Sequence, residues 1–70
     1  MIITSAKTFG DAVRMRRKEL HYTQAYLSEF SGISASFISD LERGKKTIEL
    51  EKAIRLANIL GLDCSLSKRE

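Results

Sequence analysis

Three glycines divide this chain into short helical segments, and they constrain its fold more than any other feature of the sequence. Gly32, Gly44 and Gly61 each follow a stretch in which apolar residues recur at helical spacing. Glycine adopts the left-handed conformation that ends a helix without a steric cost, so each of the three marks a helix C-terminus. The sequence contains no proline. A chain of 70 residues punctuated in this way predicts one all-α domain of short helices.

Apolar residues recur with helical periodicity in four segments of the chain. The segments span about residues 5–20, 24–31, 35–43 and 49–60. A hydroxyl residue precedes three of them: Thr4 or Ser5 the first, Thr23 the second and Ser34 the third. Such side chains favour helix starts because they accept a backbone N–H that the helix leaves free. We therefore expect a compact bundle of four to five helices within a single domain, residues 1–70.

The two ends of the chain show the patterns of short strands instead. Near the C-terminus, Leu62, Cys64 and Leu66 alternate with polar residues, which is the two-residue period of a strand. Near the N-terminus, Ile2 and Ile3 form a short β-branched stretch. We expect short terminal β-strands at residues 1–4 and 63–67, paired within one chain or across a homodimer. The three alternating residues would then contribute to the contact between the subunits.

The charge balance suits a polyanionic partner, although many proteins that do not bind nucleic acids share it. The net charge is +3, and the isoelectric point is about 9.3. The basic residues form two clusters, Arg14, Arg16, Arg17 and Lys18 in the first third and Arg43, Lys45 and Lys46 in the middle. With 43% hydrophobic and 30% charged residues, the chain is expected to fold rather than to remain disordered.

The cellular location is expected to be the bacterial cytoplasm, with the protein at the nucleoid when it binds DNA. Cys64 is the only cysteine, so no disulfide within the chain is possible and nothing indicates secretion. The apolar start of the chain is too short for a signal peptide, and no apolar run approaches the length of a membrane span. We therefore expect no membrane partner.

No constellation of residues indicates catalysis. The sequence lacks a nucleophile elbow, a phosphate-binding loop and a pattern of paired carboxylates. His21 and Cys64 are residue types that bind metals, but two isolated residues make a poor metal site. We predict that the protein is not an enzyme and needs no metal, cofactor or small-molecule substrate.

The segment of about residues 23–43 has the layout of a helix-turn-helix. Two short helices flank a turn that contains Gly32, and Ser34 begins the second of them. In this motif the second helix lies in the major groove of double-stranded DNA. The spacing therefore predicts a recognition helix that starts just after Ser34.

Three stretches of this region resemble the signature of the lambda-repressor/Cro-like family, also called the XRE family. They are Thr-Gln-Ala-Tyr-Leu at 23–27, Gly-Ile-Ser at 32–34 and Ile-Ser-Asp-Leu-Glu-Arg-Gly-Lys at 38–45. The resemblance covers roughly residues 9–61, and the segment 61–67 is similar to the C-terminal strand of HipB-type antitoxins. It implies a lambda repressor-like fold and a dimeric transcriptional repressor that binds a palindromic operator. The likeness to HipB-type proteins further implies an antitoxin that neutralises a HipA-like kinase toxin.

The resemblance also implies DNA-contacting roles for residues around the turn. They are Thr23, Gln24, Ser34, Ala35, Ser36, Ser39, Asp40, Arg43, Lys45 and Lys46. Gln24 is expected at a phosphate beside the N-terminus of its helix, and Ser34 close to the DNA backbone. The next residues, as far as Asp40, are expected to face base edges, and the basic residues after them to hold phosphates. Because the base-facing side chains are short and none is basic, we expect DNA shape or dimer spacing to carry much of the specificity.

Two structural details follow from the same resemblance. Glu42 is similar to a family glutamate that pairs with an arginine of the first helix, which is Arg17 here, so we expect an internal ion pair. His21 stands where relatives often have glycine, so we expect it in the left-handed conformation, at some energetic cost.

Three aromatic residues follow one another at helical spacing. Tyr22, Tyr26 and Phe30 occur at positions i, i+4 and i+8. Tyr22 is expected in the core, whereas Tyr26 and Phe30 correspond to positions that are usually polar in relatives. Exposed aromatic residues at this spacing predict a contact patch for a protein partner.

Two other functions remain open beside the antitoxin. The aromatic pair and the short side chains of the recognition helix favour a protein-binding inhibitor or assembly module with little DNA binding. A phage repressor or a restriction-modification controller protein would use the same DNA-binding residues.

Overall fold

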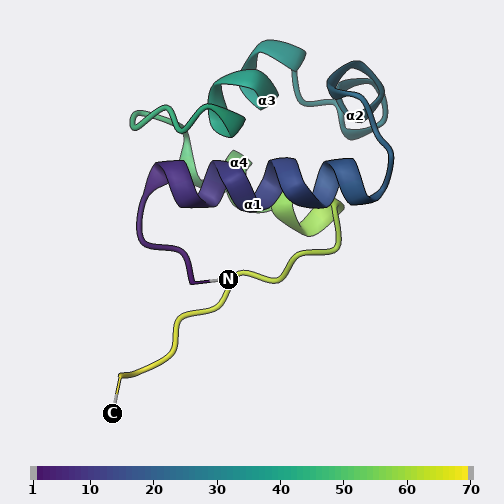
Figure 1. The fold of residues 1–70 in the computed structure, drawn as a ribbon. Helices are drawn as coiled ribbons and strands as arrows, with labels where there is room; N and C mark the ends of the chain where they lie inside the picture. The colour runs from purple at the N-terminus through teal and green to yellow at the C-terminus, as the bar shows by residue number, and fades with distance from the viewer. Residues whose placement is uncertain (1, 70) are drawn as a thin grey trace.

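The computed structural model describes residues 2–69 and contains four α-helices in that range (Figure 1). They are α1, Ala6–Glu19; α2, Gln24–Ser31; α3, Ala35–Glu42; and α4, Leu50–Ile59. The predicted all-α bundle is confirmed, and each predicted helix limit lies within one residue of the observed one. None of the helices in the described range is long and apolar enough to cross a membrane.

Hydroxyl side chains start the first three helices, as the sequence predicts. Ser5 Oγ accepts the backbone N–H of Thr8 at 3.1 Å, and Thr8 Oγ1 accepts the backbone N–H of Ser5 at 3.0 Å. Thr23 Oγ1 and Ser34 Oγ each accept the backbone N–H three residues further on, at 3.0 and 3.2 Å. Each bond satisfies an N–H that the first turn of a helix leaves without a partner.

Residues in the left-handed conformation end the helices. Gly32, Gly44 and Gly61 have φ angles of 75°, 83° and 82°, which confirms the role that their spacing predicts. His21, just after α1, has a φ of 59°, where a side chain is sterically disfavoured. The conformation expected of His21 is therefore present.

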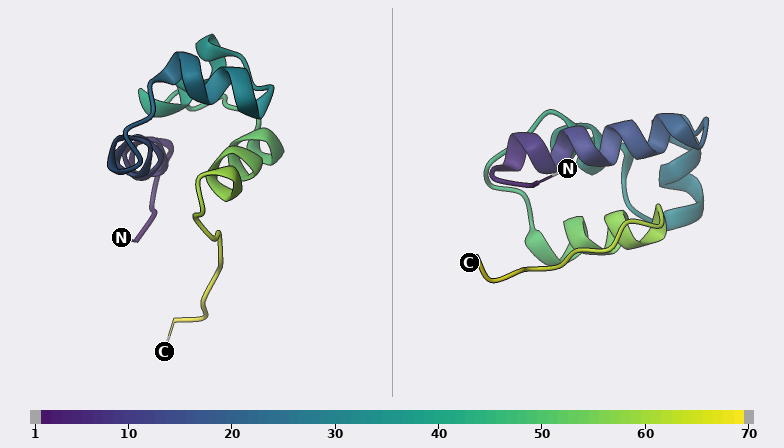
Figure 2. Two further views of the ribbon diagram at one scale, coloured as in Figure 1. Left: turned by 90° about the vertical axis from the view of Figure 1, so that its right-hand side faces the viewer. Right: turned by 60° about the horizontal axis from the view of Figure 1, so that its bottom comes forward.

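Helices α1 and α4 form one layer, and α2 and α3 lie across one side of it (Figures 1 and 2). The core takes apolar residues from all four helices and from the turn before α3: Val13, Leu27, Ile33, Ile38, Leu41, Ala53, Leu56, Ala57 and Leu60. Burial of this cluster is the main force that holds the layers together. The described ends of the chain, residues 2–4 and 62–69, lie on the side away from α2 and α3 (Figure 2).

Helices α1 and α3 approach each other closely at Gly10. A Cβ atom at this position would collide with the backbone carbonyl oxygen of Leu41. The two backbones therefore touch there, and this contact fixes the C-terminal half of α3 against α1.

The prediction of terminal strands at residues 1–4 and 63–67 is wrong for the described part of the chain. Residues 2–4 and 62–69 have no strand pairing, and the latter run away from the helices as extended chain (Figure 1). Ile2 is 85% exposed and Leu66 fully exposed. A two-residue period provides the two faces of a strand but not the neighbouring strand that must bond to it. Met1, the first residue of the predicted N-terminal strand, lies outside the described residues.

Candidate nucleic-acid interface

The turn between α2 and α3 is fixed by hydrogen bonds from two directions. Ser31 is buried at the end of α2, and its Oγ accepts the backbone N–H of Ile33 at 3.1 Å. From α4, Arg55 Nη2 donates to the backbone carbonyl of Ser31 at 3.1 Å. Ile33 itself is a core residue. These contacts fix how α2 and α3 lie relative to each other, as a helix-turn-helix requires.

Helix α3 has a buried face and an outer face. Ile38, Leu41 and Glu42 form the buried face. The outer face carries the residues expected to read bases: Ala35, Ser36, Ser39 and Asp40. The first two are exposed and the other two are half-buried. The helix is therefore held from behind while its short polar side chains remain accessible.

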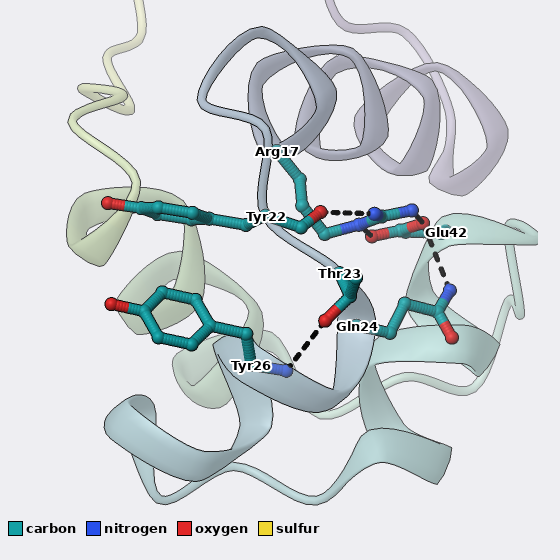
Figure 3. A network of polar contacts seen from close by, with 6 residues as sticks. All are labelled: Arg17, Tyr22, Thr23, Gln24, Tyr26 and Glu42. Carbon is teal, nitrogen blue, oxygen red and sulfur yellow. Dashed lines mark hydrogen bonds and ion pairs between the residues drawn. The ribbon is translucent and has the colours of Figure 1, made fainter.

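Arg17 and Glu42 form a buried ion pair between α1 and α3, the pair that the resemblance implies (Figure 3). Arg17 Nε and Nη2 donate to the two carboxylate oxygens at 2.7 and 2.9 Å, and Nη1 donates to the backbone carbonyl of Tyr22 at 2.7 Å. Gln24 Nε2 donates to Glu42 Oε1 at 3.1 Å. Arg17 and Glu42 are only 8% and 6% exposed. The hydrogen bond to Glu42 raises the pKa of the Arg17 guanidinium, although burial opposes the shift.

This network, Arg17–Glu42–Gln24, joins the N-terminus of α2 to the C-terminus of α3 through α1. Two parallel bonds between guanidinium and carboxylate fix direction as well as distance. Removing one partner of a buried ion pair leaves an unpaired charge and costs about 3–5 kcal/mol. The expectation for Gln24 was a phosphate contact. Its amide nitrogen is held by Glu42 at the start of α2, where the helix dipole also favours an anion.

A polar hollow of about 300 Å³ lies where α1, α2 and α3 meet. It is lined by Arg14, Gln24, Ser39, Glu42 and Arg43. The resemblance implies no DNA contact for Arg14, so sequence reasoning missed its place here. Its spacing was the available signal, because a residue three before Arg17 lies on the same side of α1. Two arginines beside a helix N-terminus provide positive charge for a phosphate group.

Asp40 lies beside two of the basic residues expected at phosphates. Arg43 Nη2 donates to its Oδ1 at 2.5 Å, and Lys45 Nζ lies 3.5 Å from its Oδ2. The hydrogen bond from Arg43 lowers the pKa of the Asp40 carboxyl below its usual value, and Lys45 lowers it further, while desolvation opposes both. Lys46, the third basic residue of the loop, is exposed.

An aromatic patch, made of Tyr22, Tyr26 and Phe30, covers another side of α2. The three ring centroids lie 5.0 to 5.4 Å from one another. Tyr22 packs partly against the core, whereas Tyr26 and Phe30 are 52% and 47% exposed. In Figure 3 the rings of Tyr22 and Tyr26 point away from Gln24 and Glu42. The aromatic patch and the polar hollow therefore lie on different sides of α2.

The residues expected at a dimer contact are not gathered into one element. Leu62 packs partly against the core, while Cys64 and Leu66 are exposed. Leu50 and Ile59 add further exposed apolar side chains on α4, at 66% and 37%.

Comparison with protein families and curated proteins identifies helix-turn-helix relatives. The family model described as helix-turn-helix matches residues 13–66. An uncharacterized HTH-type transcriptional regulator, y4mF of Sinorhizobium fredii, is 36% identical over 64 residues, which cover 91% of this chain and 82% of that protein. The ImmF control region 10 kDa protein of Bacillus phage phi105 is 29% identical over 62 residues, which cover 89% of this chain and 69% of that protein.

Solved structures with the same fold include two complexes of HipB. A HipB-O4 20mer complex has a TM-score of 0.87 at 23% identity, covering 100% of this chain and 99% of that chain. A complex of a HipB variant with an O2 20mer has a TM-score of 0.88 at 24% identity, covering 100% of this chain and 97% of that chain. At this level of identity the similarity shows the fold, with α2 and α3 in the arrangement of a helix-turn-helix.

Proposed function

The chain belongs to the helix-turn-helix family of DNA-binding regulators, and from that premise we propose that it is a transcriptional repressor that binds a palindromic operator as a homodimer. The observation that carries the proposal is the outer face of α3. Its short polar side chains are accessible, basic residues follow it directly, and the buried Arg17–Glu42–Gln24 network holds it from behind.

In this proposal α3 enters the major groove, and the groups around it hold the DNA backbone. Arg43, Lys45 and Lys46 contact phosphates on one side, while Gln24 and Arg14 contact a phosphate at the polar hollow. Two copies of α3 read half-sites about one helical turn apart.

Base reading is expected to be sparse. Ala35 can contact a thymine methyl group, and the hydroxyls of Ser36 and Ser39 can donate or accept, so they discriminate weakly between bases. The hydroxyl of Ser34 caps α3 and lies 3.4 Å from that of Ser36. Much of the selectivity is then carried by DNA shape and by the spacing of the two subunits.

The homodimer is proposed to form on the side away from α3. The segment 62–69, with the exposed Cys64 and Leu66, lies on that side, and α4 adds the exposed apolar side chains of Leu50 and Ile59. A chain of 70 residues buries a small core, and association adds to its stability.

A role as the antitoxin of a HipBA-like operon is the finer part of the proposal. The fold similarity to HipB supports it, and Tyr26 and Phe30 would contact a HipA-like kinase toxin. A phage repressor is the second candidate, because one relative is named for a phage control region. Both roles place the protein in the bacterial cytoplasm.

The test is a gel-shift titration of the purified protein on the DNA upstream of its own gene, at two salt concentrations. A specific complex whose affinity falls steeply with salt supports the proposal, because phosphate contacts release counterions. Binding no tighter than to random duplex would contradict it. Ser36→Ala with Ser39→Ala should weaken specific binding more than non-specific binding. Equal losses would contradict the base-facing role of these serines.

A further inference from the structure

Asp40 lies on the outer face of α3 with a basic side chain at each carboxylate oxygen. Arg43 Nη2 lies 2.5 Å from Oδ1, and Lys45 Nζ lies 3.5 Å from Oδ2. Within residues 2–69, Asp40 is the carboxylate whose ion pairs involve two basic residues. Both cations are residues that the proposed function needs at DNA phosphates. An acidic group that holds these two cations lowers the affinity of the protein for DNA, unless the acidic group itself makes a favourable contact with the DNA.

We propose that Asp40 is a specificity-determining residue that limits binding to non-operator DNA, because it competes with phosphates for Arg43 and Lys45. The inference rests on the proposed DNA-binding function and deepens it. Asp40 then has two states: one in which it pairs with these cations, and one in which it accepts a hydrogen bond from a base.

The competition between Asp40 and phosphates lowers the affinity for random duplex most strongly. Non-specific binding consists almost entirely of attraction between phosphates and basic side chains. A phosphate that recruits Arg43 or Lys45 must displace the Asp40 carboxylate. The carboxylate is then left near a polyanion without its partners, and like charges repel.

Operator DNA can compensate for the lost ion pairs of Asp40 where a base donates a hydrogen bond to the carboxylate. Cytosine and adenine present exocyclic amino groups in the major groove, and an aspartate can accept from them. The neighbouring side chains of Ala35, Ser36 and Ser39 are short, so Asp40 is the longest acceptor on this face of α3. A fixed register of α3 would place such an amino group opposite Asp40. The operator is therefore expected to carry an amino-bearing base at that position.

The test measures binding of the whole protein to random duplex and to its own upstream DNA by fluorescence anisotropy, at several salt concentrations. Asp40→Asn keeps the size of the side chain and removes the charge. It should bind random duplex about 3–10 times more tightly at low salt, with a salt dependence steeper by about one phosphate contact for each bound subunit. Operator affinity should change less, so the ratio of the two affinities falls. Asp40→Glu keeps the charge and should have the wild-type ratio of operator affinity to random-duplex affinity. A variant that had lost its fold would not have this ratio.

Glu19→Gln is the matched control, because it removes the charge of an exposed carboxylate that also pairs with an arginine three residues away, Arg16 of its own helix α1. It should leave both affinities unchanged. Unchanged random-duplex affinity in Asp40→Asn overturns the proposal, whatever happens at the operator. An equal gain on both DNAs also overturns it, because Asp40 would then weaken binding without selecting. A wild-type protein with no preference for its upstream DNA contradicts the repressor function instead, while the random-duplex comparison still tests the competition for the two cations.

Discussion

Two carboxylates on the same helix, Glu42 and Asp40, both pair with arginines but in opposite surroundings. Glu42 is 6% exposed and is bonded to Arg17 and Gln24 inside the protein. The Asp40 side chain is 29% exposed, and that of Arg43 is 73% exposed. The difference in burial separates two roles of α3: one carboxylate fixes the position of the helix, and the other faces the DNA-binding side.

A buried pair fixes position, whereas an exposed pair can be exchanged. The Arg17–Glu42 pair is buried and joined by two parallel hydrogen bonds, so it holds the C-terminus of α3 against α1. The pairs of Asp40 face solvent, where a phosphate can take the place of the carboxylate. Substitutions at Glu42 and at Asp40 test the two sides of this comparison separately.

The largest effect is expected from Glu42→Ala, which leaves the Arg17 charge buried without its partner. The free energy of unfolding should fall by about 3–5 kcal/mol, measured by urea denaturation followed by circular dichroism. A domain of this size has a total stability of about 5 kcal/mol or less, so much of the variant should be unfolded.

The control for this change is the double variant Arg17→Met with Glu42→Leu. It replaces the ion pair by apolar side chains and should regain most of the lost stability. If Glu42→Ala instead unfolds like the wild-type protein, the network does not hold α3 in place.

A smaller effect is expected at the polar hollow. Arg14→Ala should weaken binding to any duplex and reduce the salt dependence by about one phosphate contact for each bound subunit. Stability should stay within about 0.5 kcal/mol of the wild type, because Arg14 is exposed. Lys18→Ala removes the same charge from an exposed position of α1 that does not line the hollow, and serves as the control. Equal losses in the two variants would mean that only net charge matters.

The smallest effect is the acid dependence of Asp40. Its folded pKa lies below that of the unfolded chain, so its ion pairs stabilise the protein above about pH 4. This contribution is lost as the pH falls through the folded pKa. The difference in unfolding free energy between wild type and Asp40→Asn should therefore disappear in acid. A difference that persists at the acid end would show that the carboxylate charge is not its cause.

Local features of this chain could be predicted from sequence because local chemistry determines them. The caps at Ser5, Thr23 and Ser34 depend on a hydroxyl and an N–H three residues away. The glycine helix ends depend on a single φ angle each. The Arg17–Glu42 pair is a long-range contact, and it was accessible only through resemblance to a family.

Features that depend on packing between distant segments could not be predicted. The prediction of terminal strands is wrong because the alternation of Leu62, Cys64 and Leu66 does not specify a partner strand. The places of Arg14 and Gln24 depend on how α1 lies against α2 and α3. Asp40 was expected at base edges, and only the geometry reveals the two cations beside it.

We propose that the outer side of α3 and its following loop bind DNA independently of the network that holds the helix. The most direct measurement is the dependence of DNA affinity on salt for the wild type and for Lys45→Ala with Lys46→Ala, on the DNA upstream of the gene. In the variant, the slope of log K against log salt should become shallower by about two for each bound subunit, and so by about four for the proposed homodimer, at about 0.9 per lost phosphate contact. Its urea unfolding should match that of the wild type. An unchanged slope with unchanged stability would contradict the account, because the loop after α3 would then not touch the DNA.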